Sequence, residues 1–286
     1  MQKISIADLK IEIDSNKTLQ LEKFKPFECL DKQKPQIIVK VSASEYIPKP
    51  SGKVVLDEKI VWVKNEDGEQ DTSVYICRKE PDDIAYLLST NEQWSKANIC
   101  YKQPEFDGES AATGPLGEIL FRNRLLFNQG LVVHASAVEY DGKGIIFSAP
   151  SETGKTTQAK LWCEKMGAEL INNDRPAIRI IDNKPYIYGT PWSGEPSECN
   201  NNSASLSAII MLEQASKNYI VKLSTEEAVT RLMPRCFLPY YDRDLMNIAM
   251  NNLENLLRLV PVYLLKCKPD LEAVDLVYKT IWRDNK

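Results

Sequence analysis

The first hundred residues alternate apolar and polar side chains with the two-residue period of a half-buried strand. The clearest examples are residues 36–43 (QIIVKVSA), 53–64 (KVVLDEKIVWVK) and 72–79 (TSVYICRK), which are separated by polar turns. Such alternation places successive side chains on opposite faces of a sheet. It predicts a mostly antiparallel, β-rich N-terminal domain over residues 1–105, with one face buried and the other in water.

The periodicity breaks over residues 101–115 (YKQPEFDGESAATGP), where proline, glycine and serine gather, so we place a domain boundary there. Residues 116–130 then carry apolar side chains at helical spacing and end in Gly130, which is typical of a helix end. Residues 131–140 (LVVHASAVEY) and 142–150 (GKGIIFSAP) are typical of two strands joined by a turn at residues 141–144.

The rest of the sequence alternates helical and strand patterns. Helices are expected at residues 156–167, 225–233, 242–259 and 271–282. The first of these helices ends at Gly167, and the second has Thr225 as its N-cap. Strands are expected at residues 168–182, 184–192, 207–214, 218–224 and 262–268. The strands at 207–214 and 218–224 are expected to pair with each other. The second domain, residues 116–286, is therefore α/β and has the size of a nucleotide-binding domain, which makes the whole chain α+β.

The composition is that of a soluble globular protein, with 43% hydrophobic and 27% charged residues. The formal net charge of −4 provides no basic excess for phosphate backbones, which argues against a nucleic-acid partner. The sequence has no apolar run of about 18 residues and no basic region followed by an apolar run at its start, so we expect neither a membrane span nor a secretory signal. These patterns predict a cytoplasmic protein.

The seven cysteines are scattered and form no CxxC pair. This spacing predicts unpaired thiols in a reducing compartment rather than a disulfide framework or a zinc site. His134 is the only histidine, which excludes metal sites and acid–base mechanisms that need two histidines.

The candidate chemistry lies in residues 148–157 (SAPSETGKTT). The end of this stretch matches the phosphate-loop spacing, in which Lys155 reaches the terminal phosphates and the Thr156 hydroxyl binds magnesium. An apolar strand precedes the loop and a helix follows it, as an anion site at a helix N-terminus requires. Ala149 and Glu152 replace expected glycines: alanine is tolerated at negative φ, whereas Glu152 either points into solvent or lowers the affinity. The alternative is a surface turn that happens to contain GKTT.

A second signal is the stretch 169–181 (ELINNDRPAIRII), an apolar strand that ends in an acid. Asp174 lies 19 residues beyond Lys155 (174 − 155), which leaves room for one helix and one return strand. This arrangement is expected to bring a carboxylate to the magnesium ion. The alternative is a polar turn with no ligand.

With residues 134–136 (HAS) and 188–195 (YGTPWSGE), these motifs resemble the C-terminal kinase domain of the HPr kinase/phosphorylase family, whose fold is shared with phosphoenolpyruvate carboxykinase. The resemblance covers roughly residues 116–286, and its specific motifs lie within residues 134–195. It is closest to HPr-kinase-like proteins of unassigned substrate. The first hundred residues do not resemble the N-terminal domain of HPr kinase, so the resemblance does not imply that HPr is the substrate of this protein.

The resemblance implies roles for individual residues. It places the nucleotide phosphates on Pro150, Ser151, Glu152, Thr153, Gly154, Lys155, Thr156 and Thr157. It makes Thr156 and Asp174 the magnesium ligands and puts His134, on the strand before the loop, near the transferring phosphate. It gives catalytic roles to Lys155, Asp174, His134 and Glu195, although Glu195 could equally belong to an ordinary turn. The family has two acids where this chain has Asn173 and Asp174, and the first of them is the proposed general base; Asn173 cannot accept a proton.

These observations predict an ATP- and Mg²⁺-dependent kinase that phosphorylates a hydroxyl, with serine in a peptide or protein as the leading acceptor and a small hydroxyl-bearing molecule as another. Asn173 need not abolish the reaction, because phosphoryl transfer depends mainly on positioning and charge neutralisation. The alternative is a catalytically weak or inactive nucleotide-binding adaptor, which Glu152 and Asn173 favour. The family's members assemble into oligomers, so the resemblance also implies a homo-oligomer.

Overall fold

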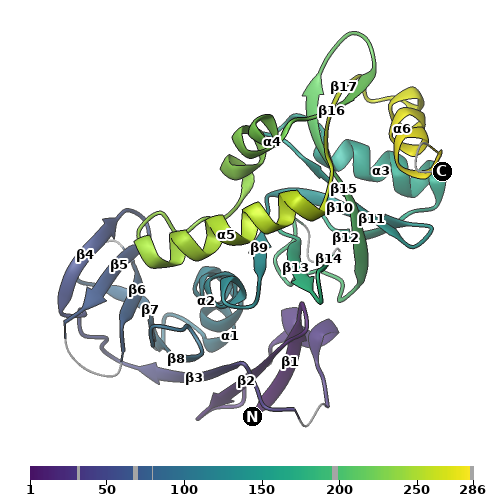
Figure 1. Cartoon of the computed structure of the whole chain (residues 1–286). Coiled ribbons are helices and arrows are strands. Elements are labelled where there is room, and N and C mark those ends of the chain that lie inside the picture. Colours follow the sequence, from purple (N-terminus) through teal and green to yellow (C-terminus); the bar gives the residue numbers. More distant parts are fainter. Residues whose placement is uncertain (31–32, 67–69, 79, 195–198, 284–286) are drawn as a thin grey trace. The chain divides into compact units, whose positions relative to one another are not determined.

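The computed structural model describes residues 1–30, 33–66, 70–78, 80–194 and 199–283, and these form a mixed α/β protein as expected (Figure 1). The chain divides into two compact units. The first comprises Met1–Phe127 and Pro239–Met246, and the second comprises Asn128–Leu238 and Asn247–Lys286. The boundary after Phe127 lies later in the chain than the boundary expected at residues 101–115.

The first unit contains an eight-stranded sheet with the order β1-β2-β3-β8-β7-β6-β5-β4. Its strands are β1 (Gln2–Ile6), β2 (Leu9–Ser15), β3 (Ile37–Ser44), β4 (Gly52–Asp57), β5 (Val61–Asn65), β6 (Thr72–Cys77), β7 (Ile84–Thr90) and β8 (Lys96–Lys102). Only the β2–β3 and β3–β8 pairs are parallel, so the sheet is mostly antiparallel as predicted. The stretch 53–64 forms the β4–β5 hairpin.

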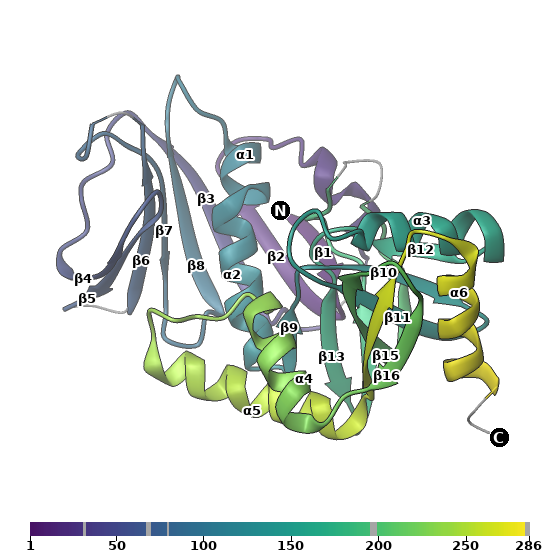
Figure 2. The same ribbon diagram turned by 90° about the horizontal axis from the view of Figure 1, so that it is seen from above.

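Three helical segments complete the N-terminal part of this unit: η1 (Glu22–Phe27), α1 (Gly108–Thr113) and α2 (Pro115–Leu126). Helix α1 contacts β3 and β8, and α2 contacts α1 and β7, so both lie against the sheet (Figure 2). Pro115 occupies the first turn of α2, where its missing N–H costs no hydrogen bond. These contacts explain why α2 belongs to the first unit although the sequence pattern assigns it to the second domain.

The segment Pro239–Met246 belongs to the first unit through two side chains, although it comes late in the sequence. The ring of Tyr241 stacks on Trp62 with a centroid distance of 3.7 Å, and its hydroxyl accepts a hydrogen bond from Asn123 Nδ2 (2.6 Å). Asp242 Oδ2 lies 2.7 Å from Lys64 Nζ. Asp242 Oδ1 also accepts hydrogen bonds from two N–H groups, those of Asp244 and Leu245 (both 3.0 Å), in the first turn of helix α5 (Arg243–Leu259).

We expect Asp242→Asn to lower the free energy of unfolding by about 1–2 kcal/mol at pH 7, because the charged hydrogen bond with Lys64 is lost while the helix cap remains. Burial alone would raise the pKa of Asp242, but its hydrogen bonds with Lys64 and the backbone outweigh burial and hold the pKa below its ordinary value of 3.8. A lowered folded-state pKa stabilises the protein above the unfolded-state pKa, and this contribution is lost as the pH falls through the folded-state value.

The difference between wild type and Asp242→Asn should therefore be complete above about pH 5 and should disappear below the folded-state pKa. Urea unfolding at a series of pH values measures this difference. Asp244→Asn, an exposed change in the same helical turn, is the control and should behave as wild type throughout. A cost of Asp242→Asn that stays constant down to low pH would show that the Lys64 pair contributes nothing.

The second unit contains a nine-stranded sheet with the path β12-β10-β11-β15-β14-β13-β9, to which β17 adds beside β15 and β16 beside β17. Its strands are β9 (Gly130–Val132), β10 (Ala135–Tyr140), β11 (Lys143–Ser148), β12 (Glu169–Asn172), β13 (Ala177–Ile181), β14 (Lys184–Tyr188), β15 (Ser203–Gln214), β16 (Tyr219–Lys222) and β17 (Val262–Cys267). Strands β11, β15 and β17 are parallel to one another. Their carboxyl ends therefore lie at one edge of the sheet, where α/β sheets commonly bind ligands.

Helices α3 (Lys155–Met166) and α6 (Leu271–Tyr278) lie beside the central strands of this sheet (Figure 1). The core between them contains Phe147 from β11, Trp162 from α3 and Val274 from α6. The remaining helical segments are α4 (Thr225–Leu232), η3 (Met233–Arg235) and η4 (Lys279–Arg283), and α5 continues into this unit beyond Met246. None of the helices described is long and apolar enough to cross a membrane.

Two apolar stretches that resemble single strands are interrupted by polar turns. The sequence pattern predicts that His134 lies within a strand, but the structure places it in a bend between β9 and β10. Its N–H donates to the carbonyl of Arg235 there (2.7 Å). Residues 168–182 likewise form two strands, β12 and β13, separated by a turn that ends at Pro176. Proline lacks an N–H and restricts the residue before it, which favours a break there.

Three smaller expectations also differ from the structure. The N-cap of α4 is Ser224 rather than Thr225, because Ser224 and Glu227 form a reciprocal capping box. Strand β16 pairs with β17 rather than with β15, whose edges are already occupied by β11, β14 and β17. The helix expected to end at Gly130 ends at Leu126, and Gly130 begins β9.

Candidate functional site

The stretch 148–157 forms a strand–loop–helix unit at the carboxyl end of β11. Strand β11 ends at Ser148, and α3 begins at Lys155 after a loop of residues 149–154. Gly154 is the N-cap with a φ of 113°, and no side chain caps the helix. The first N–H groups of α3 therefore keep their hydrogen-bonding capacity for a ligand, and the positive end of the helix dipole favours an anion.

Lys155 is held inside this loop. Its side chain is largely buried, and Nζ donates hydrogen bonds to the carbonyls of Ala149 (3.2 Å) and Pro150 (3.1 Å). Burial lowers the pKa of Lys155, and the nearby Asp174 carboxylate partly opposes this effect. The loop thus presents an ammonium group beside free backbone amides, which is a site suited to phosphate.

The two unusual residues of the loop have different backbone conformations. Ala149 is fully buried and does not take a positive φ, so its Cβ is compatible with the turn. Glu152 has a φ of 64°, in the left-handed region that favours glycine, and its side chain is exposed. Glutamate at this position is therefore strained, although its carboxylate points into solvent.

Glu152→Gly is expected to raise the free energy of unfolding by about 1 kcal/mol, because glycine adopts the left-handed conformation without a Cβ penalty. Urea unfolding gives the difference. Ser151→Gly is the matched control: Ser151 is an exposed neighbour without a positive φ, so glycine there only increases the freedom of the unfolded chain. Equal destabilisation by both changes would contradict the strain at Glu152.

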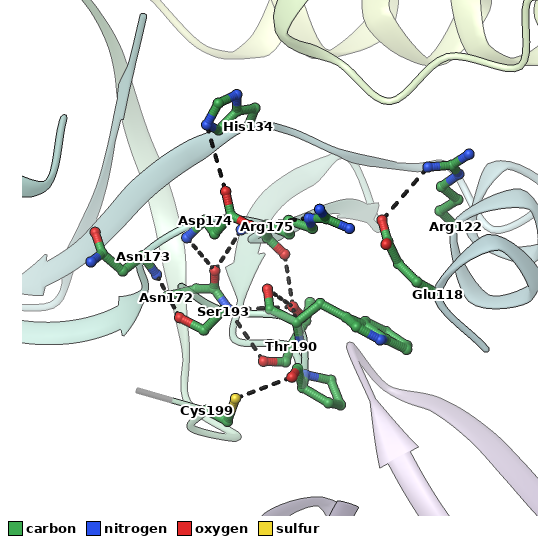
Figure 3. A network of polar contacts seen from close by, with 12 residues as sticks. Glu118, Arg122, His134, Asn172, Asn173, Asp174, Arg175, Thr190, Ser193 and Cys199 are labelled. Atoms are coloured by element: carbon green, nitrogen blue, oxygen red, sulfur yellow. Dashed lines mark hydrogen bonds and ion pairs between the residues drawn. The ribbon is translucent and has the colours of Figure 1, made fainter. Parts of the chain in front are cut away.

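Asp174 and His134 lie together, as Figure 3 shows. His134 Nε2 is 3.5 Å from Asp174 Oδ1, and Arg175 Nε donates to Asp174 Oδ2 (3.1 Å). The backbone aligns the two turns, because the N–H of Ala135 donates to the carbonyl of Asp174 (3.0 Å). The hydroxyl of Ser148, at the end of β11, donates to the carbonyl of His134 (2.9 Å) and so joins the histidine to the strand that leads into the loop.

The site carries more positive than negative charge. Burial, and then the charge of Lys155, lower the pKa of His134, while Asp174 acts in the opposite direction. A lowered pKa favours the neutral form of the imidazole at neutral pH. Arg235 lies close enough to disfavour the charged forms of both Lys155 and His134, and among the described residues it has no acidic partner within ion-pair distance. This excess of positive charge suits a polyanionic ligand.

Asn173, where the resemblance implies an acid, makes ordinary hydrogen bonds. Its Oδ1 accepts from the hydroxyl of Ser136 (2.7 Å), and its backbone N–H donates to Ser193 Oγ (3.3 Å). Glu195, the remaining predicted site residue, lies outside the described residues.

Magnesium fits the donor set at this site. The candidate ligands are the carboxylate of Asp174, which is about one-third exposed, and the hydroxyl of Thr156, which makes no hydrogen bond within the described part of the chain. No cluster of three or more His, Cys, Asp or Glu side chains that could hold a metal occurs among the described residues. Mg²⁺ typically takes one or two carboxylates together with phosphate oxygens and water, so a sparse oxygen set is compatible with it.

Sequence reasoning missed Arg235 of the site and two buried side chains that support the turn at Asp174, Asn172 and Thr190. Asn172 and Thr190 are both fully buried and join the turn at Asp174 to the segment after β14. The tendency of asparagine to hydrogen-bond backbone N–H groups two residues ahead was the available signal for Asn172. Arg235 has no local motif around it, so only the fold reveals its place near Lys155.

No protein-family model matches the sequence, and no curated protein matches it either. Among solved structures, the chain is similar to the Hpr(Ser) kinase/phosphatase from Coxiella burnetii, with 12% sequence identity and a TM-score of 0.34. The similarity covers 54% of this chain and 99% of that chain.

Proposed function

We propose that this protein is an ATP- and Mg²⁺-dependent phosphotransferase that phosphorylates a hydroxyl, with serine in a peptide or protein as the leading acceptor. The observation that carries the proposal is the Lys155 ammonium, held by two loop carbonyls at an uncapped helix N-terminus and close to Asp174. The sequence motifs support the same reaction class, since they combine a phosphate-loop ending with a downstream acid.

The chain's own residues account for phosphate binding. Lys155 exchanges its two carbonyl partners for β- and γ-phosphate oxygens, and the N–H groups at the start of α3 donate to the same anion. Arg235 adds a positive charge from a separate segment of the second unit. Holding the phosphates by fixed donors is the main requirement of phosphoryl transfer, because charge on the phosphoryl oxygens must be stabilised as the bond to the leaving group breaks.

Thr156 and Asp174 are the residues that would hold magnesium. When bound, the ion neutralises phosphate charge and orients the triphosphate. Arg175 Nε donates to Asp174 Oδ2 at 3.1 Å and restrains the carboxylate.

A proton must leave the acceptor hydroxyl as its oxygen bonds to the γ-phosphorus and ADP departs. Asn173 has no basic group for this proton, whereas the neutral imidazole of His134 does. His134 is therefore the candidate base: its Nε2 lies 3.5 Å from Asp174 Oδ1, so Asp174 orients the ring and Nδ1 is the nitrogen that accepts the proton. General-base assistance is worth about 10²–10⁴ in rate, so a reaction without it would be slow but not abolished.

The test is phosphate transfer from γ-³²P-ATP, with Mg²⁺, to a panel of serine-containing peptides, each paired with a peptide in which alanine replaces serine. Labelled peptide that depends on the serine and on Mg²⁺ is the expected result. Absence of both ATP turnover and label with every peptide and free hydroxy amino acid would contradict the assignment.

A nucleotide-binding adaptor without catalysis is the second candidate, and two observations favour it. Glu152 strains the loop at a φ of 64°, and the side-chain oxygen of Asn173 is occupied by Ser136. Phosphate transfer to an acceptor distinguishes the adaptor from the kinase. The adaptor binds an ATP analogue with Mg²⁺ but transfers no phosphate to any acceptor.

A further inference from the structure

One buried side chain organises the turn that carries Asp174. Asn172 ends β12 and has no exposed surface. Its Oδ1 accepts hydrogen bonds from the backbone N–H groups of Asp174 (2.9 Å) and Arg175 (2.7 Å). Its Nδ2 donates to the carbonyl of Thr190 (3.2 Å) and lies 3.3 Å from the Thr190 hydroxyl. One carboxamide therefore joins the turn after β12 to the segment after β14 (Figure 3).

Thr190 closes this network from the other side. It is also fully buried, and its hydroxyl donates to the carbonyl of Arg175 (2.8 Å). Thr190 thus bonds the carbonyl of Arg175 at the end of the turn, whereas Asn172 bonds the N–H groups of the two peptide units that flank Asp174. Buried polar networks of this kind hold one conformation when every member has a partner.

The direction of the Asp174 side chain depends on the side-chain oxygen of Asn172, which accepts both hydrogen bonds from the turn. Both N–H groups that follow Asn173 point to a single oxygen, so the peptide units on either side of Asp174 have a defined orientation. Removing that oxygen leaves two donors without their acceptor, and the peptide units rotate to find others. The Cα–Cβ bond of Asp174 rotates with them, which moves the carboxylate away from its place near His134 and Lys155.

We infer that Asn172 is a positioning residue for magnesium: through its side-chain oxygen it holds the carboxylate of Asp174 where the ion and the nucleotide phosphates require it. The inference rests on the proposed function. Residues that orient metal ligands without touching the metal typically contribute 10–100-fold to metal affinity. Asn172 should therefore affect magnesium dependence while leaving nucleotide binding by Lys155 and the helix N-terminus intact.

A purely structural role for Asn172 makes a different prediction. Loss of any buried hydrogen-bonded group lowers stability, and Thr190 is the matched case, because it is equally buried and belongs to the same network. Thr190→Val removes the hydroxyl but leaves both hydrogen bonds from the turn to Asn172 Oδ1. The two changes therefore separate general destabilisation from positioning of Asp174.

The experiment is isothermal titration of the full chain with a non-hydrolysable ATP analogue at a series of Mg²⁺ concentrations, for wild type, Asn172→Ala and Thr190→Val. Asn172→Ala should raise the Mg²⁺ concentration at half-saturation by about tenfold or more and leave the Mg²⁺-free affinity within about threefold. Thr190→Val should stay within about threefold on both measures. If Asn172→Ala does not fold, Asn172→Ser replaces it with the same expectation, because its shorter side chain cannot reach both N–H groups.

Three results would overturn the inference. An unchanged half-saturation in the Asn172 variant, or an equal shift in Thr190→Val, would show that the network is only structural, and the proposed function would stand. Wild-type protein that shows no Mg²⁺-dependent binding would remove the proposed function, and with it the role given to Asn172.

Discussion

Lys155→Ala is expected to weaken nucleotide binding by about 10–100-fold and to reduce phosphotransfer by a further 10²–10³-fold. The loss of affinity follows from the loss of charged hydrogen bonds, each worth about 1.5–3 kcal/mol. The further loss of phosphotransfer rate follows because a fixed donor stabilises the charge that develops on the phosphoryl group in the transition state. Titration with an ATP analogue and turnover of ATP measure the two terms separately.

The fold should tolerate this change, because within the described part of the chain the Lys155 side chain bonds only to carbonyls of its own loop, and alanine is favourable in the first turn of a helix. Lys160→Ala is the matched control, since Lys160 is exposed on the same helix. The control should bind and turn over as wild type. Unchanged binding by Lys155→Ala would refute the assignment of the loop as a phosphate site.

Asp174→Asn should reduce magnesium-dependent turnover by about 10²–10³-fold. A carboxylate is a far better ligand for Mg²⁺ than a carboxamide, and the metal's electrostatic contribution to phosphoryl transfer is several kcal/mol. Binding without Mg²⁺ should be unchanged or tighter, because removing a negative charge beside Lys155 lessens repulsion of the phosphates. Turnover as a function of Mg²⁺, together with analogue binding in EDTA, measures both effects.

Asp182→Asn is the control for Asp174→Asn, as Asp182 is an exposed acid in the turn between β13 and β14. It should leave turnover and Mg²⁺ dependence unchanged. If Asp174→Asn retained full turnover with the same Mg²⁺ dependence, another group would have to hold the ion.

The local parts of the site were predictable from sequence because their determinants are contiguous. The apolar run of β11, the Gly154-Lys155 pair and the terminal Gly167 define a strand, a loop and a helix within some 25 residues, and Gly167 caps the helix with a φ of 73° as its position suggests. The alternating pattern of the first hundred residues likewise predicted a mostly antiparallel sheet. In each case the signal is the residue spacing itself.

The rest depends on contacts between distant segments, which a single sequence does not reveal. The run LVVHASAVEY has the composition of one strand, yet it bends at His134, whose N–H donates to the carbonyl of Arg235 a hundred residues later (235 − 134 = 101). Asn172 is bonded to Thr190, which lies 18 residues further along the chain. The sequence pattern predicts that a helix begins at Asp242, next to Tyr241. Only the contacts of these two residues with Trp62 and Lys64 show that they belong to the first unit.

Isothermal titration of the wild-type protein with a non-hydrolysable ATP analogue, in the presence and absence of Mg²⁺, decides whether the loop at Lys155 binds nucleotide phosphates. The claim that residues 149–157 and Asp174 form a nucleotide-phosphate site predicts saturable binding of one analogue per chain that tightens when Mg²⁺ is added. No binding under either condition would contradict it, and would show that the strained loop at Glu152 does not accept a nucleotide.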